Sequence, residues 1–274
     1  MSSPSGSLEG NSRSARTFLL TILGDAVMPA STQVFQESLV SALGTLGISV
    51  PAARQVTARA TRDGWLTSER VGRRSLMKLS TTAASMLVEG RSRTMAFGET
   101  REWDERWLLV TLTVQEERRE VRHHFRTELG WLGFGSLGNG VWISPHASNQ
   151  EAALTLFQGK EGLKEAYVFV TETPVTHTPR DIAVTAWDLD KLLTRYVDFD
   201  ERFTRLAPVE PQAVFAAWIE LITSWRHFPL VDPELPDSLL PAKWPRQHSF
   251  ELFHSRHDEW ASVAREYFNS LDPS

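Results

Sequence analysis

Residues 130–146, GWLGFGSLGNGVWISPH, contain the glycine spacing of a nucleotide-binding loop. Gly133, Gly135 and Gly138 match the Gly-x-Gly-x-x-Gly pattern, in which backbone N–H groups and a helix N-terminus hold a pyrophosphate. That chemistry requires a strand before the glycines and a helix after them. The motif therefore has to be interpreted together with its neighbours.

The neighbouring segments have the opposite order. Residues 107–114, WLLVTLTV, are apolar and β-branched and predict a strand, and residues 116–129 predict a charged helix that leads into the glycines. The segment after them, 141–145, again predicts a strand. Because no helix follows the glycines, we predict a tight helix-to-strand return and no nicotinamide or flavin cofactor.

Other residues with catalytic or metal-binding potential form weaker patterns. Glu251, His254, His257 and Asp258 could share one face of a helix, as metal ligands do, but charged helix faces produce this pattern by chance and we predict no metal site. Ser136 lacks the glycine two positions before it that a nucleophile elbow requires. The chain has no cysteine, which excludes disulfides and thiolate chemistry.

Charge is distributed unevenly along the chain. Residues 1–95 contain 11 Lys and Arg against 6 Asp and Glu, whereas the remaining residues contain 18 against 28. A basic head on an acidic body predicts that the head binds a polyanion. No apolar run is long enough to span a membrane, and the Ser- and Gly-rich segment 1–14 predicts a disordered N-terminus of a cytoplasmic protein.

The basic head has the element order of a winged helix. Residues 17–23 predict a short helix that Gly24 and Asp25 end, and apolar residues at helical spacing predict a second helix over 35–46. Ser49 and Pro51 predict the start of a third helix. After it, residues 65–79 predict two strands joined at Val71-Gly72.

Basic and amide side chains occupy the two parts of this head that would meet DNA. Gln55, Arg59 and Arg62 lie on one face of the third helix, about 120° from its small apolar residues, and Arg and Gln read guanine and adenine edges in the major groove. The hairpin tip supplies arginines for backbone phosphates. The predicted DNA-binding residues are Arg54, Gln55, Arg59, Arg62, Arg70, Arg73 and Arg74.

The rest of the chain predicts an α+β protein with three folded parts. A short strand near 131–134, a helix over 149–158 and a strand over 166–171 complete a βαββαβ order, which is that of a ferredoxin-like domain. Helical periodicity dominates after residue 187. The predicted domains are a winged helix with a linker helix (15–95), a ferredoxin-like middle domain (96–178) and a helical C-terminal domain (179–274).

Three stretches in fixed order make the chain resemble the PaaX-like repressors, which regulate phenylacetic acid degradation operons. They are ARQVTARATRDGWLTSERVGRRSLMKLS (53–80), WDERWLLVTLTVQEERREVRHHFRTELGWLGFGSLGNGVWISPH (103–146) and WRHFPLVDPELPDSLLPAKWP (225–245). The resemblance implies a winged-helix transcriptional repressor with a middle domain similar to the Cas2 fold. It places the recognition helix on Ala52 to Arg62 and the wing on Arg70 to Lys78.

The resemblance also implies an effector, since such repressors are typically released by an aryl-CoA thioester such as phenylacetyl-CoA. That ligand needs an aromatic-lined slot for its acyl group and cationic or N–H donors for its phosphates. The stretch from Trp225 to Trp244 contains both kinds of side chain, and Trp142 and His146 of the middle domain could oppose it. The predicted effector-binding residues are Trp142, His146, Trp225, Arg226, His227 and Trp244.

Two function classes remain open. The first is a non-enzymatic homodimeric repressor of a double-stranded operator, because one winged helix reads few base pairs and gains specificity from a two-fold partner. The alternative is an enzyme, either a dinucleotide enzyme or a metal-dependent nuclease of Cas2-like fold. Cas2-like nucleases use an aspartate at the end of the first strand, whereas this strand ends Val114-Gln115-Glu116.

Overall fold

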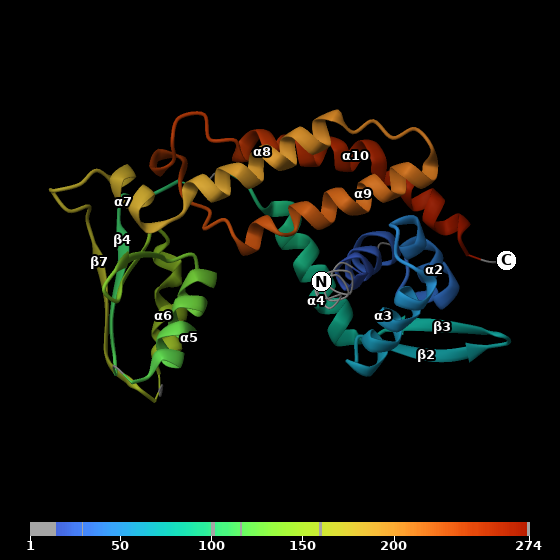
Figure 1. Ribbon diagram of the computed structural model, residues 1–274, viewed down its shortest axis with the longest axis horizontal. Coiled ribbons are helices and arrows are strands. Elements are labelled where there is room, and N and C mark those ends of the chain that lie inside the picture. The colour runs from blue at the N-terminus through green and yellow to red at the C-terminus, as the bar shows by residue number, and fades with distance from the viewer. Residues whose placement is uncertain (1–14, 29, 100–101, 116, 159–160, 273–274) are drawn as a thin grey trace, which may run out of the picture. The chain divides into compact units, whose positions relative to one another are not determined.

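The computed structural model describes residues 15–28, 30–99, 102–115, 117–158 and 161–272 (Figure 1). The segment 1–14, predicted to be disordered, lies outside these residues. The chain divides into two compact units: unit 1 is Met1–Phe97, Asp200–His227 and Glu251–Ser274, and unit 2 is Gly98–Phe199 and Phe228–Phe250. In the described part of the chain, no helix is both long and apolar enough to cross a membrane.

The N-terminal part of unit 1 is a winged helix. Its elements are η1 (Ile22–Val27), β1 (Gln33–Phe35), α2 (Gln36–Thr45), α3 (Val50–Arg62), β2 (Leu66–Val71), β3 (Arg74–Leu79) and α4 (Thr81–Ala96). The strands form an antiparallel sheet in the order β1-β3-β2. Gln36 Nε2 donates a hydrogen bond to Thr57 Oγ1 at 3.2 Å, which fixes α2 against α3.

The prediction that Gly24 and Asp25 end the first helix is wrong. Residues 15–21 are α-helical, and the helix continues through both residues as the π-helix η1. All six residues of η1 are buried, and the Asp25 carboxylate is paired with arginines. Burial and ion pairing outweigh the low helix propensity of Gly and Asp, which is a weak local preference.

Helices from the C-terminal part of the chain complete unit 1. They are α9 (Pro211–Trp225), the end of α8 (Leu189–Arg205) and most of α10 (Arg246–Ser270). Trp225 stacks on Phe253 with ring centroids 5.0 Å apart, and its Nε1 donates a hydrogen bond to the Thr94 carbonyl at 3.1 Å. These contacts join α4, α9 and α10 in one core. Both α8 and α10 continue from one unit into the other.

Unit 2 contains a ferredoxin-like domain. Its elements are β4 (Trp107–Val114), α5 (Arg119–Trp131), β5 (Gly135–Gly138), β6 (Val141–Ser144), η2 (Ala147–Asn149), α6 (Gln150–Phe157) and β7 (Leu163–Thr171). The strand order is β5-β6-β4-β7 with every pair antiparallel, so β4 is central. Figure 1 shows α5 and α6 together on one face of this sheet, where Leu108 and Val110 pack against Leu129 and Ala153.

The other face of the sheet is covered near β5 and β6. Helix α7 (Pro179–Ala186) and the short helix η4 (Asp237–Leu239) contribute Ile182, Ala183 and Leu239 to a cluster with Trp107 and Ile143. A capping box in which Thr178 and Asp181 exchange hydrogen bonds fixes the start of α7. The one-turn helix η3 (Phe228–Leu230) begins the second stretch of unit 2.

The strand predicted near 131–134 is displaced. Trp131 is the last residue of α5, and the strand begins at Gly135 instead. Gly133 has a φ of 78°, and the Phe134 N–H donates to the Leu129 carbonyl at 2.9 Å, which closes the helix end. The apolar residues here therefore complete a helix C-terminus rather than a strand.

The three glycines of the motif have separate structural reasons. Gly133 and Gly138 have φ values of 78° and 87°, in the left-handed region that favours glycine. A Cβ on Gly135 would lie 2.6 Å from the Trp187 ring and 2.7 Å from the Ala186 Cβ. The helix before and the strand after them agree with the predicted helix-to-strand return.

We expect Gly135→Ala to destabilise unit 2 by about 1–3 kcal/mol, because the added methyl group forces the Trp187 ring and α7 away from the sheet. Urea denaturation followed by tryptophan fluorescence measures the change. Gly130→Ala in α5 is the matched control: its Cβ would meet no atom within 4 Å, so the helix gains about 0.5–1 kcal/mol. Equal stability of the two variants would contradict the packing role of Gly135.

Candidate nucleic-acid interface

The polar face of α3 is open to solvent. Ala53, Val56 and Thr57 are buried against the winged-helix core. Ser49 and Pro51 lie at the start of the helix as predicted. The four side chains of α3 that were predicted to bind DNA are all exposed: Arg54, Gln55, Arg59 and Arg62. A helix with one face in the core and Arg and Gln on the other has the form of a recognition helix.

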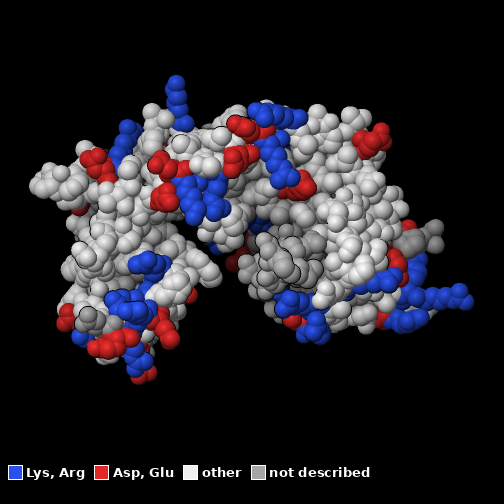
Figure 2. Space-filling model, in the orientation of Figure 1, with Lys and Arg blue, Asp and Glu red and all other residues white. Residues whose placement is uncertain are grey.

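The β2–β3 hairpin exposes two further arginines. Gly72 lies in the turn with a φ of 62°, and Arg70 and Arg73 flank it with exposed side chains. The Arg70 Nε donates a hydrogen bond to the Gly72 carbonyl at 3.2 Å, which orders the tip. In the space-filling view, blue side chains are more frequent than red ones over α3 and the hairpin (Figure 2).

Arg74 differs from its neighbours because its side chain is engaged within unit 1. Its guanidinium carbon lies 3.7 Å from the centroid of the Phe35 ring, and its Nη2 is 3.0 Å from Asp272 Oδ1. Only 29% of the side chain is exposed. A phosphate would compete with Asp272 for this arginine, and phosphate binding by Arg74 stays a prediction.

Arg16 is a basic residue of this surface that sequence reasoning missed. Its Nη1 is 3.5 Å from Asp63 Oδ2, at the C-terminal end of α3. Arg16 and Arg59 line the same small recess, together with Trp65. In the sequence, Arg16 is a single arginine at the start of an apolar helix. No local pattern relates it to Asp63, which lies more than forty positions later.

The first group of predicted effector residues follows the end of α9 in unit 1. Trp225 has no exposed surface and belongs to the core described above. Arg226 Nη2 lies 2.8 Å from Asp25 Oδ2, with 22% of the Arg226 side chain exposed. His227 is exposed. Of the three, His227 is therefore the most accessible to a ligand.

The second group lies in unit 2. Trp142 is buried in the core of the ferredoxin-like domain. His146 is half-buried, and its Nε2 lies 2.9 Å from the Pro233 carbonyl, which brings β6 and the Pro-rich connector together. Trp244 is half-buried, and its indole N–H is enclosed without a hydrogen-bond partner among the described residues.

A buried polar network adjoins Trp244. The Trp244 ring centroid lies 6.2 Å from that of Tyr196, whose hydroxyl donates a hydrogen bond to the Asp232 carboxylate. Burial and the charge of Asp232 raise the pKa of the Tyr196 phenol far above its usual value. Arg246 Nη2 donates to the Leu235 carbonyl at 2.6 Å. This network orders the connector that carries Trp244.

Three of the four α10 residues considered as a metal cluster, His254, His257 and Asp258, have other hydrogen-bond partners. His254 Nε2 lies 3.1 Å from the Met95 carbonyl, and His257 Nδ1 lies 3.1 Å from Asp258 Oδ1. Burial lowers the pKa of His257 below its usual value. Among the described residues, no three His, Asp or Glu side chains are grouped to hold a metal ion.

Three family models match the chain in consecutive segments. They are the PaaX-like protein model at residues 14–83, the PaaX protein central Cas2-like domain at residues 100–183 and the PaaX-like protein C-terminal domain at residues 187–270. The chain belongs to the PaaX-like family. The matched segments contain the winged helix up to the start of α4, the Cas2-like middle part and the helices α8 to α10.

Two known proteins are similar to this PaaX-like chain. "Transcriptional repressor PaaX" of Escherichia coli (strain K12) is 26% identical over an alignment of 243 residues, which covers 84% of this chain and 75% of that protein. The solved structure of the uncharacterized protein Rv0674 from Mycobacterium tuberculosis superposes with a TM-score of 0.61 at 20% identity. That comparison covers 94% of this chain and 99% of the other, and it shows the fold.

The two neighbouring wing arginines of this PaaX-like chain are expected to differ in their effect on stability. Arg74→Ala removes the contacts with Phe35 and Asp272 and lowers the free energy of unfolding by about 1 kcal/mol. Arg73→Ala removes an exposed side chain and changes it by less than about 0.5 kcal/mol. Thermal and urea unfolding of both variants measures the difference. A destabilised Arg73→Ala beside an unchanged Arg74→Ala would contradict these assignments.

Proposed function

We propose that this chain is a transcriptional repressor that binds double-stranded operator DNA sequence-specifically. The observation that carries the proposal is the exposed Arg and Gln face of α3 beside a basic hairpin tip, in a chain of the PaaX-like family. The similarity to a protein named as a transcriptional repressor supports repression of transcription over activation.

Base reading and phosphate binding would be divided between two elements. Gln55, Arg59 and Arg62 have the side chains that form bidentate contacts with adenine and guanine edges, and α3 presents them on its solvent face. Arg70 and Arg73 at the hairpin tip would bind backbone phosphates, which carry no sequence information. The division predicts different consequences for the two groups of substitutions.

A homodimer follows from the small size of this interface. One recognition helix contacts only a few base pairs, and a two-fold partner doubles the site and selects a palindromic operator. Light scattering with and without operator DNA tests this part of the proposal. A mass of one chain, 30.9 kDa, under both conditions would contradict it.

The proposed effector is an aryl-CoA thioester such as phenylacetyl-CoA. A ligand releases a repressor only if it binds the DNA-incompetent arrangement better than the competent one. In unit 1 the His227 side chain is exposed, and in unit 2 the enclosed indole N–H of Trp244 has no hydrogen-bond partner among the described residues. Trp142, Trp225 and Arg226 are engaged in cores or ion pairs, so their participation would require those contacts to change.

A nuclease of the Cas2-like middle part is the competing function, and no described feature favours it over the repressor. Selection of bound fragments from a random DNA library, followed by gel retardation, separates the two. The repressor retards its selected sequence in EDTA and leaves it intact, whereas a nuclease cleaves DNA on addition of Mg²⁺ or Mn²⁺. Metal-dependent cleavage without specific retardation would overturn the proposal.

Substitutions on α3 and at the hairpin tip should weaken DNA binding in different ways. Arg59→Ala is expected to cost about 1–3 kcal/mol of binding to the selected operator and little on random DNA. Arg73→Ala is expected to weaken binding to both sequences and to reduce the slope of log affinity against log salt by about one. Fluorescence anisotropy at several salt concentrations measures both quantities.

Arg205→Ala is the control for these variants, because Arg205 is an exposed arginine at the end of α8 whose ion pair with Glu201 lies outside the winged helix. It should bind DNA like the wild type. The α3 assignment fails if Arg59→Ala binds the operator with unchanged affinity, and the tip assignment fails if the loss in Arg73→Ala is confined to one sequence.

Calorimetry with phenylacetyl-CoA tests the effector. The wild type should bind it and release operator DNA, and Arg226→Ala and His227→Ala should bind it about tenfold or more weakly, as expected for loss of a hydrogen bond to a charged group. Circular dichroism confirms that each variant is folded. Unchanged affinity in both variants would remove these residues from the site, and no binding by the wild type would exclude this effector.

A further inference from the structure

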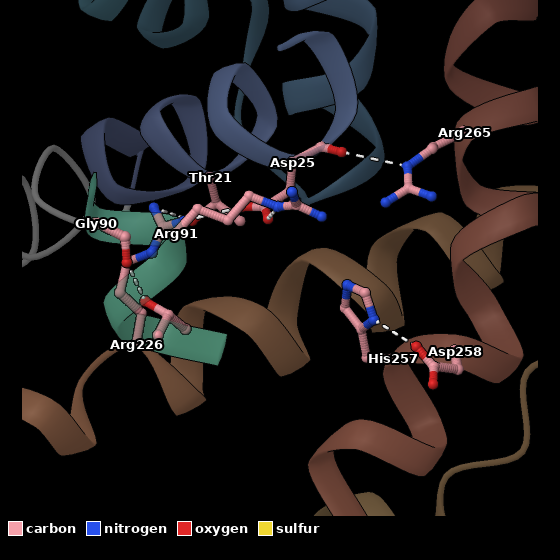
Figure 3. A network of polar contacts seen from close by, with 9 residues as sticks. Thr21, Asp25, Gly90, Arg91, Arg226, His257, Asp258 and Arg265 are labelled. Atoms are coloured by element: carbon pink, nitrogen blue, oxygen red, sulfur yellow. Dashed lines mark hydrogen bonds and ion pairs between the residues drawn. The ribbon is translucent and has the colours of Figure 1, made fainter. Parts of the chain in front are cut away.

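Three arginines from separate parts of unit 1 contact one buried aspartate, two through its carboxylate and one through its main-chain carbonyl (Figure 3). Asp25, on η1, is 1% exposed. Arg91 of α4 places its Nε 3.1 Å from Oδ1, and Arg226, after α9, places its Nη2 2.8 Å from Oδ2. Arg265 of α10 points its Nε at the Asp25 main-chain carbonyl, 3.4 Å away. We call these four residues the Asp25 cluster.

The Asp25 cluster has more positive than negative charge. Among the described residues, no second carboxylate lies within ion-pair distance of the three guanidinium groups. Asp258 Oδ1 lies 3.1 Å from His257 Nδ1, and Asp258 forms no ion pair with these arginines. One aspartate therefore faces three arginines, which leaves a surplus of two positive charges.

This surplus lies in a partly desolvated place. Arg226 and Arg91 have 22% and 38% of their side chains exposed. Burial and the nearby charge of Arg91 lower the pKa of Arg265, whereas the charge of Asp25 acts in the opposite direction. Charges removed from water without a counter-charge are costly, so an added anion would relieve the cluster.

Two further features point to a ligand at the same place. The Arg226 Nε is enclosed and has no hydrogen-bond partner among the described residues, although a guanidinium normally uses its donors when buried. Asp25 also lies in a π-helix, a rare conformation that occurs frequently at functional sites.

We propose that the Asp25 cluster binds a small anion that carries a phosphate or pyrophosphate group. Two surplus charges match a phosphate dianion, and planar guanidinium groups bind its oxygens in the bidentate geometry that single ammonium groups lack. The exposed part of Arg91 gives the anion a route from solvent. The site itself does not depend on the proposed repressor function.

A consequence for DNA binding does rest on that function. Arg91 and Arg226 connect η1 of the winged helix to α4 and to the end of α9 through Asp25. An anion that takes hydrogen bonds from these arginines weakens their pairing with Asp25. The occupied site would then alter how the C-terminal helices hold the first helix of the DNA-binding part.

Pyrophosphate is the probe for the site, titrated into the full chain by calorimetry at ionic strength held constant with NaCl. Arg265→Gln and Arg91→Gln each remove one surplus charge and should weaken pyrophosphate binding by about tenfold or more. Asp25→Asn removes the competing carboxylate and should strengthen binding several-fold. Arg205→Gln, an exposed arginine outside the cluster, should bind within about twofold of the wild type.

Equal affinity of the wild type, Arg265→Gln and Arg91→Gln would overturn the proposal, as would weaker binding by a folded Asp25→Asn. Loss of binding in Arg59→Ala or Arg73→Ala instead would assign the anion to the DNA-binding surface. None of these titrations uses DNA. They therefore test the anion site even if the chain proves not to be a repressor. Pyrophosphate binding without phenylacetyl-CoA binding would retain the site and exclude only that effector.

Discussion

The ion pair between Asp25 and Arg226 is the interaction on which unit 1 depends most. It joins residues about 200 positions apart, and the carboxylate it contains is almost completely removed from water. Arg91 also pairs with this carboxylate, and leaving such a buried charge without any partner costs about 3–5 kcal/mol, which is a large part of the stability of an ordinary domain. The pair links the first helix, where it continues through Gly24 and Asp25, to the end of α9.

The ion pair between Asp25 and Arg226 is also an interaction that hydrophobic periodicity could not predict. The elements of the winged helix and the βαββαβ order followed from local signals, because helix spacing, β-branched runs and turn glycines act over a few residues. The continuation of the first helix did not, since Gly24 and Asp25 locally favour a turn and only distant arginines reverse that preference. Sequence position likewise gave no sign that Trp225 would bond to Thr94.

The candidate nucleic-acid interface likewise has features that the sequence could predict and features that it could not. The exposure of Gln55 and Arg59 was predictable, because the apolar face of α3 fixes the opposite face by geometry. The different roles of Arg73 and Arg74 were not, because the Phe35 ring and Asp272 that engage Arg74 come from the first strand and the end of the chain. Local pattern identifies which face a side chain occupies, whereas its partners depend on the tertiary fold.

Helices α8 and α10 each contribute residues to both units, which affects the order in which the two units are completed during synthesis. The last residue of unit 2 is Phe250, so the ribosome has made all of that unit while unit 1 still lacks Glu251–Ser274. Phe253, which stacks on Trp225 in the unit 1 core, is among the residues still to come. Domains usually complete their folding from the N-terminus during translation. In this chain the unit that begins first acquires its full core last, and the winged helix emerges long before the helices that support it.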